Sequence, residues 1–234
     1  MTGRLYRWPE AARFGRIVPK AKFYEQGTVP SAVREKFIAE VQRITWAYKL
    51  AANTINLPGT STVPEIQVFQ IETKGDDVSE SVLTAIDRAV KTPIIFEITR
   101  GDGPARRTRM VAAHKTASSS GAARPGAYYT TGWQPDDTGR QPLPTAIDLP
   151  ALYAGLLESL ASLTARPGED ATELAARLES VRKLEREVAA LEQKLRAEPQ
   201  LNRKVEIRRA LKTKQAALAV LINPSPGPVP GAQN

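Results

Sequence analysis

The sequence has no cysteine and only one histidine, His114. Without cysteine, the chain cannot form disulfide bonds, use a thiol in catalysis or build a zinc site on sulfur ligands. A single histidine cannot supply a multi-histidine metal centre. Many familiar classes of active site and metal site are therefore excluded.

Long apolar segments are also missing. No stretch approaches the roughly 18 consecutive apolar residues of a membrane-spanning helix, and residues 1–14 lack the continuous apolar segment of a secretion signal. We therefore expect a cytoplasmic protein with no membrane partner. Its 234 residues, 41% apolar and 25% charged, are typical of a globular chain of one or two domains.

Positive charge is in excess, with 33 Lys and Arg against 25 Asp and Glu and a formal net charge of +8. Residues 1–30 hold six basic residues against two acidic ones, interleaved with aromatic residues. We interpret this segment as a basic aromatic N-terminal arm. Such an arm suits contact with a polyanion, and solubilising charge explains it equally well.

The pattern from residue 31 to residue 166 predicts an α+β domain. Apolar residues spaced by three and four from Val33 to Tyr48 predict a helix over 32–51. Shorter helices are predicted after Asp77 and from Leu149. The β-rich segments lie at 65–74, 94–100, 107–115 and 127–133. Because only one connection is long enough for a crossover, we expect a small four-stranded sheet, mixed or mainly antiparallel, with flanking helices.

The C-terminal part predicts two long helices, over 172–197 and about 200–222, with a turn at Pro199. Val181, Val188 and Leu195 form a seven-residue apolar series. This spacing is typical of a coiled coil, so we expect an antiparallel coiled-coil helical hairpin over 169–222. The proline-rich residues 223–234 are expected to be a disordered tail.

Basic residues gather at two places that could contact a partner or nucleic acid. The segment 199–222 has six basic residues against one acidic, whereas 169–198 has six against eight. Opposite charges favour pairing of the two helices, and the surplus on the second remains available for phosphates or an acidic partner. A second group surrounds the predicted turn after Arg100. The candidate contact residues are Arg203, Lys204, Arg208, Arg209, Arg106, Arg107 and Arg109.

One triplet has catalytic potential. Glu72 and Lys74, separated by one residue at the end of a predicted strand, are similar to the acid-x-lysine of PD-(D/E)-x-K nucleases, in which carboxylates hold a divalent metal. Asp76 could add an oxygen ligand. That core needs a further acidic residue on a neighbouring strand, which the preceding sequence does not supply. An exposed strand end followed by a helix cap accounts for the same residues.

His114 lies close in sequence to Ser118, Ser119 and Ser120, so a hydroxyl-histidine pair is conceivable. No nucleophile elbow accompanies these residues, and serines beside a glycine are typical of a loop. We favour a solvated histidine at a strand end.

Several segments together resemble the uncharacterised bacterial family catalogued as domain of unknown function 4391. The resemblance covers nearly the whole chain except the proline-rich tail, and EPQLNRKVE is its most specific segment. The matching segments are 44–57, 64–74, 85–98, MVAAHK, YYTTGW and 183–209. The family has no assigned activity. Its members tend to be encoded beside helicases and DNA methyltransferases in restriction-like or phage-defence loci, which implies an accessory role.

We therefore predict a non-enzymatic accessory subunit of a bacterial DNA-processing system, without a cofactor. Its expected partner is a helicase or DNA methyltransferase of the same locus, with DNA as a further ligand of the basic residues. Two alternatives stay open: a magnesium-dependent nuclease that uses Glu72 and Lys74, and a homodimer that associates through the helical hairpin.

Overall fold

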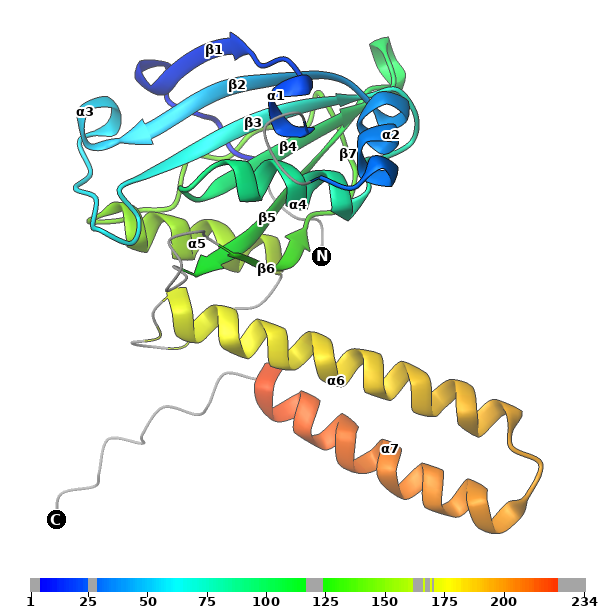
Figure 1. The fold of residues 1–234 in the computed structure, drawn as a ribbon. Helices are drawn as coiled ribbons and strands as arrows, with labels where there is room; N and C mark the ends of the chain where they lie inside the picture. The colour runs from blue at the N-terminus through cyan, green and yellow to red at the C-terminus, as the bar shows by residue number, and fades with distance from the viewer. Residues whose placement is uncertain are drawn as a thin grey trace, which may run out of the picture. The chain divides into compact units, whose positions relative to one another are not determined.

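The computed structural model describes residues 5–24, 29–116, 124–161, 166, 169 and 171–222 (Figure 1). The chain forms two compact units, residues 1–162 and 163–234. Among the described residues, no helix combines the length and the apolar character needed to cross a membrane. The predicted disorder of residues 223–234 concerns a segment outside the described residues.

The first unit is built on a mixed sheet of seven strands. Six strands lie side by side in chain order, and β7 pairs with β5 beside this path. All neighbouring pairs are antiparallel except β3 and β4, which are parallel and joined through helix α4 (Glu80–Ala89). The strands are β1 (Arg13–Ile17), β2 (Val41–Ala51), β3 (Glu65–Thr73), β4 (Ile94–Arg100), β5 (Arg107–Thr116), β6 (Arg124–Thr130) and β7 (Gln134–Pro135).

The prediction of a four-stranded sheet was wrong, mainly because β2 has an unusual burial pattern. Helix α2 (Ser31–Glu40) ends where the predicted helix was expected to continue. In β2, a buried residue recurs at every third position from Val41 to Leu50, because two register shifts against β3 interrupt the usual alternation. This spacing imitates the period of a helix. Strand β1 lies in the segment interpreted as an arm, and β7 has only two residues.

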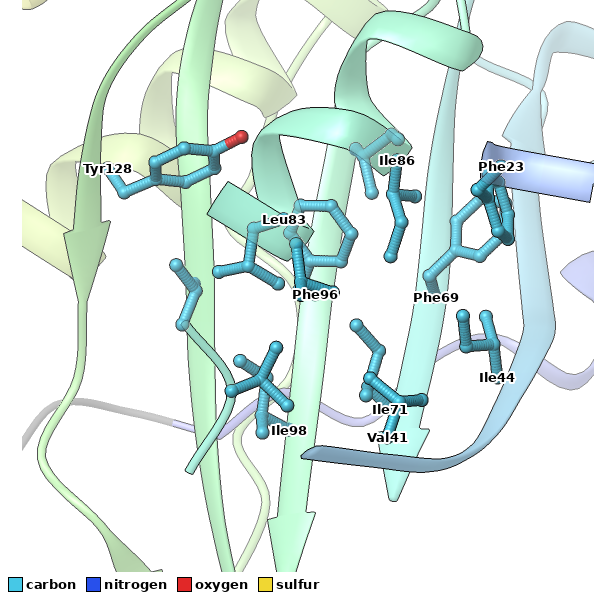
Figure 2. Close-up of a cluster of buried hydrophobic side chains, with 14 of the residues drawn as sticks. Phe23, Val41, Ile44, Phe69, Ile71, Leu83, Ile86, Phe96, Ile98 and Tyr128 are labelled. Carbon is cyan, nitrogen blue, oxygen red and sulfur yellow. The ribbon is translucent and has the colours of Figure 1, made fainter. Parts of the chain in front are cut away.

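Helix α4 covers one face of the sheet with an apolar core (Figure 2). Phe69 and Ile71 of β3 and Phe96 and Ile98 of β4 face Leu83 and Ile86 of the helix. Alternate strand residues point to the other face, and helix α5 (Leu149–Ala161) packs against β3, β5 and β6. The remaining short elements are η1 (Glu10–Ala12), α1 (Ala21–Tyr24), α3 (Ala52–Ile55) and η2 (Gly103–Ala105).

A buried carboxylate, Glu97 of β4, joins three distant segments. It is 1% exposed, and its Oε1 accepts hydrogen bonds from Trp8 Nε1 at 2.9 Å and Arg140 Nη1 at 2.6 Å. Gln70 Nε2 donates to Oε2 at 3.0 Å. Arg140 also donates to the carbonyl of Tyr6. The rings of Tyr6 and Trp8 are buried, so these aromatic residues of the N-terminal segment belong to the core of the unit.

The second unit contains helices α6 (Ala171–Ala197) and α7 (Leu201–Ile222), which run antiparallel (Figure 1). Arg177 Nη1 donates to the carbonyl of Leu221 at 2.9 Å, and Lys214 forms an ion pair with Glu187 at 2.6 Å. The first contact joins the start of α6 to the end of α7, and the second joins the middles of the two helices.

The pair does not define the coiled-coil hairpin that the sequence predicted. Leu178 and Val181 are buried, but from Leu184 onward the apolar positions of α6 are only half-buried. Arg177, which is also buried, interrupts the apolar series and binds Glu169 at 2.7 Å. An uneven series of this kind lacks the continuous apolar contact that a coiled coil requires.

The fold predicts different costs for removing two carboxylates. Replacing Glu97 by Ala leaves Trp8 Nε1 and the Arg140 guanidinium without their acceptor, so the free energy of unfolding should fall by about 2–4 kcal/mol. Replacing Glu72, whose ion pair with Arg43 is substantially exposed, should cost less than about 1 kcal/mol. Urea unfolding followed by tryptophan fluorescence measures both, since all three tryptophans lie in residues 1–162. Equal losses would contradict the central role of Glu97.

Candidate anion-binding site

Arginine side chains converge where β4 ends and β5 begins. The turn between these strands places Arg100 opposite Arg107 and Ile98 opposite Arg109 in the antiparallel register. Cross-strand partners lie on the same face of a sheet, so Arg100, Arg107 and Arg109 share the face on which Ile98 packs in the core beneath α4. Gly101 makes this turn with a φ of +69°, a conformation that other residues rarely adopt.

Trp133 contacts two members of the group. The guanidinium carbon of Arg100 is 4.4 Å from the ring centroid and that of Arg109 is 5.1 Å from it, both within cation-π range. Trp133 also packs against the apolar core beneath α4. The ring is therefore held by the core and serves as a platform for two cationic side chains.

Further contacts orient the two arginines on this platform. Arg109 Nη2 lies 2.6 Å from Asp77 Oδ1, and Arg109 Nη1 donates to Thr130 Oγ1 at 2.8 Å. Arg100 Nη1 donates to the carbonyl of Asp76 at 3.2 Å. The two side chains are thus held before any ligand arrives.

Two of the four arginines are not neutralised. Arg109 pairs with Asp77, and Arg106 Nε lies 3.2 Å from Asp136 Oδ2. Arg107 donates only to the carbonyls of Pro104 and Arg106, and Arg100 has no ion pair within the described part of the chain. A guanidinium has five N–H donors, so Arg100 and Arg107 retain donors for a ligand. We call Arg100, Arg106, Arg107, Arg109 and Trp133 the arginine cluster.

The chemistry of this cluster suits an anion with several oxygen atoms. Planar guanidinium groups bind phosphate and carboxylate oxygens through paired hydrogen bonds. All four arginine side chains are partly exposed, so a ligand can reach them from solvent. The cluster offers charge and hydrogen-bond donors, with no nucleophile or general base among its members.

The sequence predicted Arg106, Arg107 and Arg109 as contact residues, and the structure brings these three together with Arg100. It also shows that Arg106 and Arg109 are already paired with carboxylates. Trp133 was missed as a contact residue. Its position at the end of a predicted strand was visible in the sequence, but its contact with the arginines depends on how that strand and β5 pair.

The other predicted basic residues lie on α7 in the second unit. Arg203, Arg208 and Arg209 are exposed and Lys204 is half-buried. Their placement on one helix agrees with the expected helix over 200–222. The two groups of basic residues belong to different units, and each is described by itself.

The residues of the predicted nuclease have separate partners in the structure. Glu72 forms an ion pair with Arg43 of β2, with Nε of the arginine 3.1 Å from Oε1. Lys74 Nζ donates to the carbonyl of Ile38 at 2.7 Å. Across the described ranges, no group of three or more His, Asp and Glu residues could hold a metal ion, Asp76 included. The neighbour of Glu72 is a cation, where the nuclease would need a second carboxylate.

The side chain of His114 packs against an aromatic ring of α5. His114 lies 6.2 Å from the ring of Tyr153 in a stacked arrangement, which joins β5 to α5. The serines that could pair with it, Ser118 to Ser120, lie outside the described residues.

A buried charged group that the sequence did not indicate joins α4 to β5 and β6. Lys115 Nζ lies 2.8 Å from Asp87 Oδ1, and Tyr128 Oη donates to Asp87 Oδ2 at 2.5 Å. Burial raises the pKa of Asp87 and lowers that of Lys115, and each is opposed by the charge of the other. Lys115 also donates to the carbonyls of Val90 and Thr92. With 3% and 1% exposure, the two charged side chains are inaccessible to a ligand and serve to hold the helix on the sheet.

A cavity of about 700 Å³ lies between α4 and two segments before it, residues 22–23 and 29–33. Its lining is mainly apolar, with Phe23, Val33 and Ala85, and its charged residues Lys22, Glu80 and Arg88 are exposed at the helix surface. This composition suits an apolar guest, and it supplies no buried acid or base for a reaction.

The fold is that of an α+β protein with an arginine cluster in the first unit and two long helices in the second. The family described as "Domain of unknown function (DUF4391)" matches residues 7–218. The match spans most of the sequence, so the chain belongs to this family, as the resemblance predicted. No curated protein and no solved structure matches the chain significantly.

The environment of Glu72 predicts the response to a divalent metal. Because Glu72 is paired with the cation Arg43 and not with a second carboxylate, millimolar Mn²⁺ should change the melting temperature of the wild-type protein and of Glu72→Ala by the same amount. A ligand that binds only the folded state raises its stability, so differential scanning fluorimetry detects a site directly. Stabilisation of the wild type that is lost in Glu72→Ala would revive the nuclease alternative.

Proposed function

We propose that this protein is a non-enzymatic accessory subunit of a bacterial DNA-processing system and that its arginine cluster binds the phosphates of nucleic acid. The observation that carries the proposal is the placement of Arg100 and Arg109 on Trp133, next to Arg107. Four arginines are gathered on one turn, and only two of them have carboxylate partners among the described residues.

The geometry favours phosphate contact over recognition of bases. Trp133 is in contact with two guanidinium groups and with the core, so its ring is not a free surface for base stacking. The groups that a ligand meets are guanidinium N–H donors. Such contacts bind the backbone irrespective of sequence and weaken as salt concentration rises.

The accessory role is supported by the family resemblance, which implies a helicase or DNA methyltransferase as partner in the cytoplasm. In this proposal the arginine cluster contacts DNA, and the basic surface of α7 contacts the partner. The nuclease alternative receives no comparable support, because Glu72 and Lys74 point to separate partners. Self-association through the helical unit predicts a dimer of the full-length protein in size-exclusion light scattering.

Charge reversal at the cluster tests the DNA-binding part of the proposal. The double variant Arg100→Glu and Arg107→Glu should bind a fluorescent DNA duplex at least about tenfold more weakly at moderate salt, because two phosphate contacts become repulsive. Fluorescence anisotropy of the full-length protein measures the affinity, and circular dichroism verifies folding.

The matched control is Arg13→Glu with Arg16→Glu. Both residues are exposed on β1, and the change in net charge is the same. This control should lose much less affinity. Equal losses in the two doubles would show a response to net charge alone, and unchanged binding in Arg100→Glu with Arg107→Glu would refute the site.

A further inference from the structure

We propose that the outer face of α7 is a docking site for an amphipathic helix that presents carboxylates. The inference rests on the proposed accessory role, and it names the surface and the chemistry of the partner. It starts from two different faces on α7. Ile207, Leu211 and Leu218 are half-buried and lie on the side that packs against α6. A second set lies on the opposite side of the helix, and we call it the outer face. Its members are Val205, Arg209, Lys212, Ala216 and Val220.

The spacing of these residues places them on one stripe. They follow each other at intervals of three or four positions, which returns to the same side of a helix at each step. All five are exposed. The stripe has an apolar residue at each end, two cations in the first half and an alanine between Lys212 and Val220.

Apolar exposure is concentrated on this helix. Val205 is 41% exposed, Val220 is 69% exposed and Ile222 is 42% exposed. Across the described residues only three other large apolar side chains, Ile17, Ile38 and Ile147, are exposed in this way. One helix of 22 residues therefore holds half of the set. Val205 and Val220 belong to the outer face, whereas Ile222 lies four positions after Leu218 and therefore on the side that packs against α6.

The cations of the outer face determine the sign of the partner. Lys214 of α7 is paired with Glu187, but Arg209 and Lys212 have no ion pair within the described part of the second unit. When apolar neighbours are covered, such cations lose water and need carboxylates in return. An amphipathic helix with apolar residues at intervals of three and four, flanked by Glu or Asp, satisfies both requirements.

Other occupants fit less well. A phosphate backbone would pair with Arg209 and Lys212 but would leave Val205 and Val220 without apolar contact. A lipid surface is usually bound through larger apolar side chains, such as Trp, Phe and Leu, than valine and alanine. A second copy would bring together two helices that each carry six basic residues and one acidic residue. The composition therefore favours an acidic helix from another protein.

The test selects the partner's chemistry without assuming its identity. A displayed library of amphipathic helices has fixed leucines at intervals of three and four, with Glu, Gln or Lys allowed at the flanking positions. It is selected on the immobilised full-length protein. We expect Glu to be enriched at the flanking positions. Lack of enrichment, or enrichment of Lys, would overturn the proposal.

The best selected peptide, labelled with a fluorophore, is then titrated with three double variants. Val205→Asp with Val220→Asp and Arg209→Glu with Lys212→Glu should each weaken binding at least about tenfold, equivalent to ~1.4 kcal/mol. The matched control, Lys194→Glu with Arg196→Glu on the exposed surface of α6, should change the affinity less than about twofold. Equal weakening in all three would overturn the assignment. Because the substituted residues are exposed, the variants should retain their helix content, which circular dichroism measures.

Competing occupants give distinct results. A dimer in size-exclusion light scattering that dissociates in Val205→Asp with Val220→Asp would assign the face to a second copy. Loss of binding to DNA or to phosphatidylserine vesicles in Arg209→Glu with Lys212→Glu, with peptide binding retained, would assign it to those ligands. The variant Arg100→Glu with Arg107→Glu should bind the peptide normally, so a failure of docking and a failure of DNA binding by the cluster are separable.

Discussion

The buried carboxylate of Glu97 is the interaction on which the first unit depends. It lies on the central strand β4, and its hydrogen bonds attach Trp8 from the start of the chain and Arg140 from the segment after β7. A buried charge is costly unless it is fully paired, so each of these segments must be in place for the sheet to be stable. Arg140 is close in sequence to Trp133 and Asp136. The segment that Glu97 holds is therefore the one that carries the platform and one of the counter-charges of the arginine cluster.

The cluster follows from the same arrangement. β7 pairs with β5 at Arg107 and Thr108, which brings Trp133 beneath Arg100 and Arg109. Asp77 and Asp136 offset the repulsion between the arginines, and the charges of Arg100 and Arg107 remain for a ligand. A surface built in this way offers guanidinium donors and no reactive group among its members. This is the physical reason for proposing an accessory binding protein, together with the family to which the chain belongs.

Local patterns in the sequence predicted much of this structure. The strands β3 to β6 and the helices α4 to α7 lie close to their predicted positions, because each has a clear period or turn residues at its ends. Arg106, Arg107 and Arg109 could be found because they surround one turn. Strand β2 could not be predicted from the sequence, since its register shifts against β3 give a buried residue at every third position, as in a helix. This error also hid Arg43, the partner of Glu72, and so left the nuclease motif plausible. The contacts of Glu97 with Trp8 and Arg140 join residues far apart in the sequence, although a glutamate within the apolar segment IIFEITR was a sign of a buried partner.

The central claim is that Arg100 and Arg107 contact phosphates, and the salt dependence of DNA binding tests it most directly. The logarithm of the affinity for a duplex falls linearly with the logarithm of salt concentration, with a slope of roughly 0.9 for each phosphate neutralised. The account predicts that Arg100→Gln with Arg107→Gln reduces this slope by about 2, whereas Arg13→Gln with Arg16→Gln leaves it unchanged. Identical slopes for the wild type and Arg100→Gln with Arg107→Gln would contradict the account.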